Sequence, residues 1–525
     1  MPSALKKTSY VVLGLIALVI VINFGLSYWV SKKLPELLAS EKKFPYNLAY
    51  KDLDLNLFTG SAALKEAYLA PKDSAEQKIK TGIYAHIDKI EINHLNLWAL
   101  WRENKIKVKG INIVSPKVIL HNSGKDYNAK DEAVKPLKQA ITTNGLEIHK
   151  GNFTMLDSTG QTVLKAANIN FSLNDIKVDS TTVKENIPVR YNGYNFDCDS
   201  LLFKPDNFYN ITAGKFSCND SSLTVQDFKM LPRQSRAQFN NMIPVERDQF
   251  TLQAGRIAIP ENDWGFLNDT LYVHAPEVLL EKVNANIYRG KMVKDDFSIK
   301  KLYSEMLRSL NFDLKVEKLM LKNSTIEYEE QLTYSRPPAS VTFSSFYATV
   351  HNVYSPINKD SMPNTVIDVQ CRFMKAAPLK VNWAFNVMDT SDTFNITGHL
   401  QNIDSKNINP ISRPLMNVTT TGTIKNVKFN FMGNRNDATG TFAIEYDDLK
   451  VKLYKKDGKE KNKFMSFIGN MLVKNDSRDK LKETHIKTER VKHKSFFNFL
   501  WRCVQDGLKQ TLLPGIISGG SKEKD

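Results

Sequence analysis

Short alternating runs of apolar residues recur along the chain with one internal spacing. In residues 111–120, INIVSPKVIL, two apolar pairs stand on either side of a break at Ser115-Pro116. Such self-similarity indicates a repetitive architecture. The apolar positions of the four copies are Ile111, Ile113, Val118 and Leu120; Leu146, Ile148, Phe153 and Met155; Leu271, Val273, Val278 and Leu280; and Leu319, Leu321, Ile326 and Tyr328, with breaks at Ser115-Pro116, Lys150-Gly151, Ala275-Pro276 and Asn323-Ser324.

The spacing predicts strands with one apolar face and one polar face. Residues i and i+2 of a strand share a face, so the five-residue step from Ile113 to Val118 would turn the second pair over unless the chain bulges or turns at the break. A hairpin would set Ile113 opposite Val118, and Gly151 suits such a turn. Proline, with φ fixed near about −65°, fits such a turn poorly. We therefore favour a bulged strand.

The N-terminal part of the sequence predicts a membrane anchor. Residues 10–30, YVVLGLIALVIVINFGLSYWV, carry no charge and as a helix would span the apolar core of a bilayer, about 30 Å. The alternative is a signal peptide, but the apolar run is longer than a signal peptide needs and no small-x-small cleavage site follows it. We expect a cytoplasmic stub at 1–9, a transmembrane helix at 10–30 and a juxtamembrane helix at 31–45.

Alternation dominates from residue 46 to about residue 455 and predicts a β domain. Alternating runs occur at 53–57, 90–92 and 95–97, with Asn, Asp, Gly and Ser between them. Segments 236–247 and 297–310 have the spacing of amphipathic helices. Because no long helix alternates with the strands, we expect an antiparallel sheet. The predicted fold is mainly β, with short helices and a helical tail at 456–525.

The tail combines positive charge with amphipathic spacing. The net charge of the chain is +16, and residues 450–525 carry 19 Lys or Arg against 9 Asp or Glu. Segment 464–473 is amphipathic. A basic helix with aromatic residues is typical of membrane-surface binding, although a helix that caps the β domain would have the same pattern. We do not expect nucleic acid as a partner. The membrane-surface residues we predict are Phe497, Leu500, Trp501, Val504, Leu508 and Leu512.

The sequence carries no recognisable catalytic or cofactor motif. The patterns GxSxG, GxxxxGK[ST], HExxH and GxGxxG are all missing. The nine histidines are scattered singly, and we interpret His86, His94, His149 and His274 as strand residues rather than ligands. The four cysteines show no metal-binding spacing. Cys198 and Cys218 could pair only if neighbouring strands carry them, and four free thiols are the alternative we favour. We expect neither an enzyme nor a cofactor.

Three passages, together with the apolar N-terminal stretch, resemble AsmA-like proteins, in particular those of Bacteroidota. They are IKVKGINIVSPKVILHN, LRSLNFDLKVEKLMLKNSTIEYEE and NPISRPLMNVTTTGTIKNVKFNFMGNRNDATGTFAIEYDDLKVKLY, and the closing KSFFNFLWRCVQDGLKQTLLPG is similar to tails of the same family. The resemblance implies a single-pass inner-membrane protein whose periplasmic part, residues 46–455, forms an elongated, curled antiparallel sheet. It also implies an apolar trough along that sheet, phospholipid transport and a role in outer-membrane integrity.

Repeat pattern and resemblance lead to one hypothesis with two alternatives. An apolar sheet face must be covered, and we expect phospholipid acyl chains to cover it along the repeat positions, as a passive conduit. The basic tail would bind the outer membrane or an envelope protein. The first alternative is a non-enzymatic envelope scaffold or assembly factor whose interior is filled by its own side chains. The second is an anchored hydrolase, which would need polar residues that converge at one place.

Overall fold

The structure, a computed structural model, describes residues 46–56, 59–72, 81–103, 105–122, 140–179, 181–182, 185–187, 189–357, 359–454, 476–478 and 480–512. The predicted helices 10–30 and 31–45 and the amphipathic segment 464–473 lie outside these residues. In the part of the chain that is described, no helix is long and apolar enough to cross a membrane. The chain divides into two compact units, Met1–Phe228 and Lys229–Asp525.

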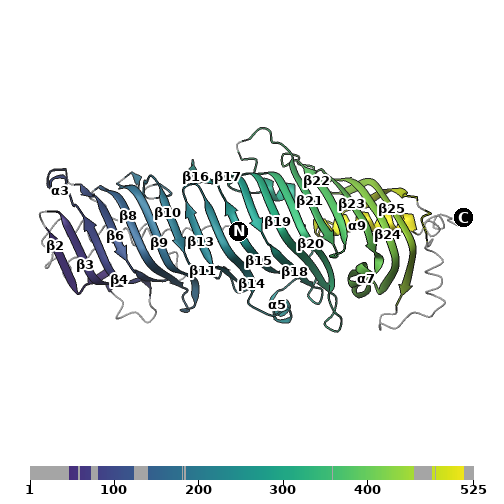
Figure 1. The fold of residues 1–525 in the computed structure, drawn as a ribbon, viewed down its shortest axis with the longest axis horizontal. Helices are drawn as coiled ribbons and strands as arrows, with labels where there is room; N and C mark the ends of the chain where they lie inside the picture. Colours follow the sequence, from purple (N-terminus) through teal and green to yellow (C-terminus); the bar gives the residue numbers. More distant parts are fainter. Residues whose placement is uncertain are drawn as a thin grey trace. The chain divides into compact units, whose positions relative to one another are not determined.

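The first unit is built almost entirely of strands, which follow one another side by side (Figure 1). The strand predicted at 95–97 is wrong, because residues 95–96 belong to no strand and residue 97 begins a short helix, α3 (Leu97–Glu103). The strands are β1 (Tyr46–Ala49), β2 (Asp52–Asn56), β3 (Ser61–Pro71), β4 (Gly82–Asn93), β5 (Ile106–Val108), β6 (Gly110–Val114), β7 (Lys117–His121), β8 (Ile141–Leu156), β9 (Thr162–Val178), β10 (Tyr194–Cys198), β11 (Ser200–Phe203), β12 (Tyr209–Ala213) and β13 (Lys215–Asn219), and the boundary at Phe228 falls within β14 (Leu223–Pro232).

The second unit has longer strands and most of the described helices. Its strands are β15 (Asp248–Ile259), β16 (Asp263–Leu267), β17 (Thr270–Glu281), β18 (Asn284–Gly290), β19 (Asp313–Gln331), β20 (Ala339–Tyr354), β21 (Thr365–Phe373), β22 (Ala377–Phe385), β23 (Phe394–Asp404), β24 (Val418–Gly433), β25 (Asp437–Leu453) and β26 (Lys482–Glu489). Its helices are α5 (Arg236–Met242), α6 (Tyr303–Arg308), the 3-10 helix η3 (Ser405–Ile408), α7 (Asn409–Met416) and α9 (Phe496–Leu512).

The mainly β class is confirmed, but the sheet is mixed rather than purely antiparallel. In the first unit β5, β6 and β7 run parallel to β8, and in the second unit β17 and β18 run parallel to β19. The antiparallel prediction failed because a half-buried strand alternates in the same way whichever direction its neighbour runs. The pattern of faces therefore carries no information about direction.

Two of the helices lie in segments predicted to be helical, and the prediction for the tail was correct only in part. The segment predicted as a helix at 236–247 contains α5, which begins at a capping box between Ser235 and Gln238 and ends before Pro244, where the chain turns extended. The helix predicted at 297–310 is the shorter α6. The tail predicted as helical from 456 contains a strand, β26, before its helix α9, so that prediction was wrong in part.

Candidate apolar groove

The breaks of the first two repeat copies are strand bulges. β6 and β7 pair with the same two strands, β4 and β8, so the chain passes Ser115-Pro116 without reversing. Ser115 has φ 52° and Lys150 has φ 56°, a left-handed conformation that is uncommon outside glycine. The Ser115 amide donates to the His149 carbonyl over 2.8 Å, and the Asn152 amide donates to the Pro116 carbonyl over 2.7 Å. The two bulges lie side by side, which confirms the bulged strand over the hairpin.

The same two copies pair with each other in register. Ile111 lies beside Leu146, and Ile113 beside Ile148. After the bulge the register continues from Val118 to Leu120, which lie beside Phe153 and Met155. All eight side chains are buried in one hydrophobic cluster of the first unit. The repeated five-residue step thus has a physical cause, because parallel neighbours keep their pairing only if both bulge at the same level.

The third and fourth copies pair in a shifted register. Val278 and Leu280, the second pair of one copy, lie beside Leu319 and Leu321, the first pair of the next. The break that faces Asn323 is therefore Lys282-Val283 and not Ala275-Pro276. Lys282 has φ 54° and Asn323 has φ 51°. The remaining positions have other neighbours: Leu271 and Val273 lie opposite Phe266 and Trp264, and Ile326 and Tyr328 lie beside Ala285 and Ile287.

Cross-strand pairing extends the repeat positions of the first unit into two apolar rows. Residues opposite one another in a sheet share a face, so each row marks a line of side chains across the strands. The first row is Leu53, Leu64, Ile90, Ile113, Ile148, Phe171, Phe196, Cys218 and Leu223. The second row is Leu48, Leu69, Ala85, Val118, Phe153, Ala166, Leu201 and Ala213.

The second unit has two apolar rows of its own. They begin near the third repeat copy and continue to β25 and β26. We name them row A and row B. Row A is Val278, Leu319, Val350, Ile367, Trp383, Ile396, Phe431, Gly440 and Ile486. Row B is Ile257, Leu280, Leu321, Ala348, Val369, Val381, Gly398, Phe429 and Phe442.

Burial differs between the two sets of repeat positions. The eight positions of the first unit are each 9% exposed or less. The eight positions of the second unit are all partly exposed. Row A changes along its length: Val278, Leu319, Val350 and Ile367 are partly exposed, whereas Ile396, Phe431 and Ile486 are buried. Among the described residues, apolar side chains thus remain accessible on β17 to β21.

Helix α9 covers the far end of rows A and B. The Phe496 ring stacks on Trp383 with 4.4 Å between centroids and 5° between planes, and it meets Phe394 edge-on at 5.2 Å. At Gly507 the helix lies against Phe442, where an added Cβ would stand 2.2 Å from the ring. Figure 1 shows α9 across strands β23 to β25. The capping role, one of two alternatives from the sequence, is therefore present in α9.

The predicted membrane-surface residues of α9 fall into two groups. Leu500, Val504, Leu508 and Leu512 are partly buried and pack against the hydrophobic cluster of the second unit. Phe497 and Trp501 are 61% and 42% exposed. Sequence reasoning missed the most buried face of the helix, Phe496, Phe499 and Cys503. The spacing of Phe496, Phe499 and Cys503 at i, i+3 and i+7 was the signal that could have found it.

Buried charges hold α6 and the segment before α9 in place. The Asp392 carboxylate, whose side chain is fully buried, accepts from Ser304 at 2.8 Å, Arg308 at 2.7 Å and Arg435 at 2.9 Å. Burial alone would raise the pKa of Asp392, but these hydrogen bonds outweigh it and lower the pKa. Glu246 follows the same pattern. Burial would raise its pKa, but its contacts with Lys291 and Lys494 outweigh burial and lower the pKa.

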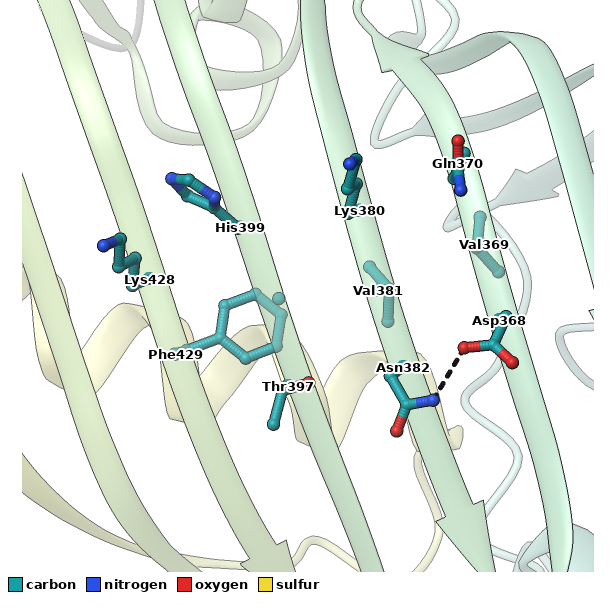
Figure 2. Close-up of a pocket in the computed structure, with 11 residues that line it drawn as sticks. Asp368, Val369, Gln370, Lys380, Val381, Asn382, Thr397, His399, Lys428 and Phe429 are labelled. Atoms are coloured by element: carbon teal, nitrogen blue, oxygen red, sulfur yellow. Dashed lines mark hydrogen bonds between the residues drawn. The ribbon is translucent and has the colours of Figure 1, made fainter.

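A shallow depression of about 450 Å³ lies over β21 to β24 (Figure 2). The polar side chains that line it form two cross-strand sets: Asp368, Asn382 and Thr397, and Gln370, Lys380, His399 and Lys428. Successive side chains of a strand point to opposite faces, so these sets lie on the other face from row B. Four members of row B, Val369, Val381, Gly398 and Phe429, also line the depression, so residues of both faces contribute to it.

Potential ligands and nucleophiles are dispersed. His86, His149 and His274 each contact one carboxylate, Glu66, Glu147 and Asp313. Among the described residues one group of three possible metal ligands, Glu66, His86 and Asp88, lies within 4.8 Å. All four cysteines are free, as the favoured alternative from the sequence had it, and Cys198 and Cys218 do not form a disulfide. Burial raises the pKa of Cys198, Cys371 and Cys503 to about 11, which disfavours thiolate chemistry.

Comparison of the chain with models of known protein families and with curated proteins gave no match. The resemblance to AsmA-like proteins therefore stays a prediction. The site described above is defined by its own geometry, which consists of apolar rows across a mixed sheet, partial exposure of row A on β17 to β21, and a helix over the far end of rows A and B.

Proposed function

We propose that this protein binds the acyl chains of phospholipids along its apolar rows and lets them pass between membranes as a passive conduit. We further propose that it is a single-pass protein of the inner membrane with most of its chain in the periplasm, and that it serves phospholipid transport to the outer membrane. The observation that carries the proposal is the partial exposure of row A, and of row B except Ala348, on β17 to β21. Extended apolar surface in water is costly unless a partner covers it.

The chemistry of the rows suits acyl chains. Aliphatic side chains such as Leu319, Val350 and Ile367 offer dispersion contacts without hydrogen-bonding groups, so they bind an apolar chain without fixing its position along the row. Burial of each methylene group contributes about 0.8 kcal/mol. A chain that moves by one row position exchanges equivalent contacts, which is the condition for passive movement.

Photo-crosslinking in cells tests the proposal. A photo-reactive residue at Val278 in row A should capture phospholipid, detected by mass spectrometry of the purified protein. The neighbouring Glu277 is the matched control, because its side chain points to the other face. We expect lipid adducts at Val278 and none at Glu277. If neither position yields lipid while both yield intramolecular crosslinks, protein covers the row and the conduit is wrong.

The first unit supports a second candidate, a non-enzymatic envelope scaffold. Its repeat positions are buried to the extent that a protein-filled interior requires. The same crosslinking at Val118, with exposed Lys117 as control, separates the two functions in this unit. Lipid at Val118 would extend the conduit into the first unit. Intramolecular crosslinks alone would mean that the first unit is a support for the part that binds lipid.

A further inference from the structure

Six large apolar side chains of the second unit form an exposed patch beside α9. We name Phe297, Ile299, Tyr303, Met306, Phe497 and Trp501 the docking patch. Their exposed fractions range from 38% at Tyr303 to 72% at Phe297 and Ile299. Isolated exposed apolar side chains are common on proteins, but several together mark an interaction surface.

The two segments that supply the docking patch are held side by side. The Lys300 amide donates to the Lys492 carbonyl over 2.9 Å. The ring of Phe297 lies 5.1 Å from that of His493, and the ring of Tyr303 lies 6.4 Å from that of Phe497. Residues from both segments therefore belong to one surface, although nearly two hundred positions separate them in the sequence.

Buried polar contacts make the base of the patch rigid. Arg490 donates to the Lys300 carbonyl. Lys494 bridges Glu246 at 3.1 Å and Asp295 at 3.4 Å. Beneath Phe497, the side chains of Phe496 and Phe499 are 5% and 1% exposed. The exposed aromatics are thus presented on an ordered support, so their exposure does not come from a loosely attached helix.

The surroundings of the docking patch are positively charged. Segments 291–309 and 490–512 together carry ten Lys or Arg residues against four Asp or Glu residues, and two acids from outside these segments, Glu246 and Asp392, pair with Lys291, Lys494 and Arg308. Three of the four acids are Asp296, which pairs with Lys300, Asp295, which pairs with Lys494, and Glu305 of α6. The exposed Lys301 and Lys492 stand next to the backbone contact that joins the segments. Such a surface attracts anions and repels a basic partner.

We propose that the docking patch inserts into the surface of a bilayer that contains anionic phospholipid. Phe and Trp side chains are favourable at the boundary between headgroups and acyl chains, and lysines beside them meet the negative surface potential. The membrane contact itself is independent of the proposed function. Only its purpose, which is to bring rows A and B to a membrane, rests on the proposed function.

Local fluorescence on the full chain tests the insertion. A bimane label is attached to Phe497→Cys, with Cys218→Ser to remove the half-buried thiol, and to Phe266→Cys as control. Phe266 is 43% exposed on β16 of the same unit and outside the docking patch. With vesicles of phosphatidylglycerol and phosphatidylcholine in equal parts, we expect a blue shift at 497 and none at 266. Because the label reports only its own surroundings, attachment of the chain through another segment leaves the readout unaffected.

Charge and salt complete the test. Each basic residue near an anionic surface contributes about fivefold to binding. Replacing Lys301 and Lys492 together by alanine should therefore raise the lipid concentration that gives half of the full shift at 497 roughly twenty-five-fold, and high salt should abolish the shift. An absent shift at 497, an equal shift at 266, or an equal shift with pure phosphatidylcholine would overturn the proposal. Lipid adducts at Val278 without a shift at 497 would support the proposed conduit and contradict the proposed insertion of the docking patch.

Discussion

At the scale of single residues, Asp392 is the group on which the placement of α6 depends most. Its carboxylate meets Ser304 and Arg308 of α6 and Arg435 of the turn between β24 and β25. Arg308 also donates to the carbonyls of Val387 and Asp389 at 2.8 and 2.9 Å. A buried charge that keeps all its partners lowers the stability of the fold little. Once that charge is removed, its partners remain as uncompensated charges and destabilise the fold.

Asp392→Asn should therefore destabilise the second unit strongly. We expect a loss of about 3–5 kcal/mol, because two guanidinium groups lose a buried counter-charge. Urea unfolding followed by circular dichroism measures it. Asp368→Asn is the matched control, since Asp368 is exposed and its bond to Asn382 lies on the surface, and its cost should stay within about 0.5 kcal/mol. Equal losses for the two variants would mean that Asp392 is not an anchor.

The pH dependence of the same variant has a defined sign. The pKa of Asp392 is lower in the folded than in the unfolded chain. Its stabilising contribution is therefore complete above the unfolded value, near 3.8, and disappears as the pH falls through the still lower folded value. The stability difference between the original chain and Asp392→Asn should be constant from neutral pH to about pH 5 and shrink below about pH 4. A difference that grew on acidification would contradict the lowered pKa.

At the scale of elements, two adjacent faces of helix α9 have different roles. Phe496 and Phe499 fill the sheet side, and Phe497 and Trp501 face outwards. Phe496→Ala should cost about 3–5 kcal/mol, because it removes the ring stacked on Trp383 and leaves a cavity. Phe497→Ala, one residue away and 61% exposed, should cost less than about 0.5 kcal/mol. Thermal unfolding of the pair compares them, and a large cost at 497 would mean that the docking patch is part of the core.

The elements also show what the sequence could and could not reveal. The step from Ile113 to Val118 predicted the bulge at Ser115, because only a local irregularity keeps both pairs in one cluster. Strand direction and the shifted register at Lys282 could not be read, since both depend on partners far away in the chain. β26 was missed because Ile486 is the one aliphatic residue between Lys482 and Glu489, too little for a strand signal. The sequence predicted two residues of the docking patch, Phe497 and Trp501 of α9. It could not reveal Phe297 and Ile299, because tertiary contacts bring them to the same surface.

At the scale of the whole molecule, each unit carries its own apolar rows, and the two units differ in how much of those rows is accessible. In the first unit the repeat positions are buried, and in the second unit row A is partly exposed on β17 to β21 and buried at Trp383, Ile396 and Phe431, where α9 covers the strands. A conduit needs an accessible row, and a support does not. The two units therefore suit different parts of the proposed function.

A crosslinking scan along row A turns this difference into a prediction. Photo-reactive residues at Leu319, Val350 and Ile367, which are partly exposed, should capture phospholipid. The same residue at Ile396 or Phe431, which are 3% and 0% exposed, should capture α9 or neighbouring strands instead. The reason is geometric, because a reactive group joins whatever lies within a few ångströms of it. Lipid at all five positions would mean that α9 leaves the row in cells, and α9 would then be a displaceable cover rather than a fixed end. Lipid at none of them would leave the sheet without its proposed ligand.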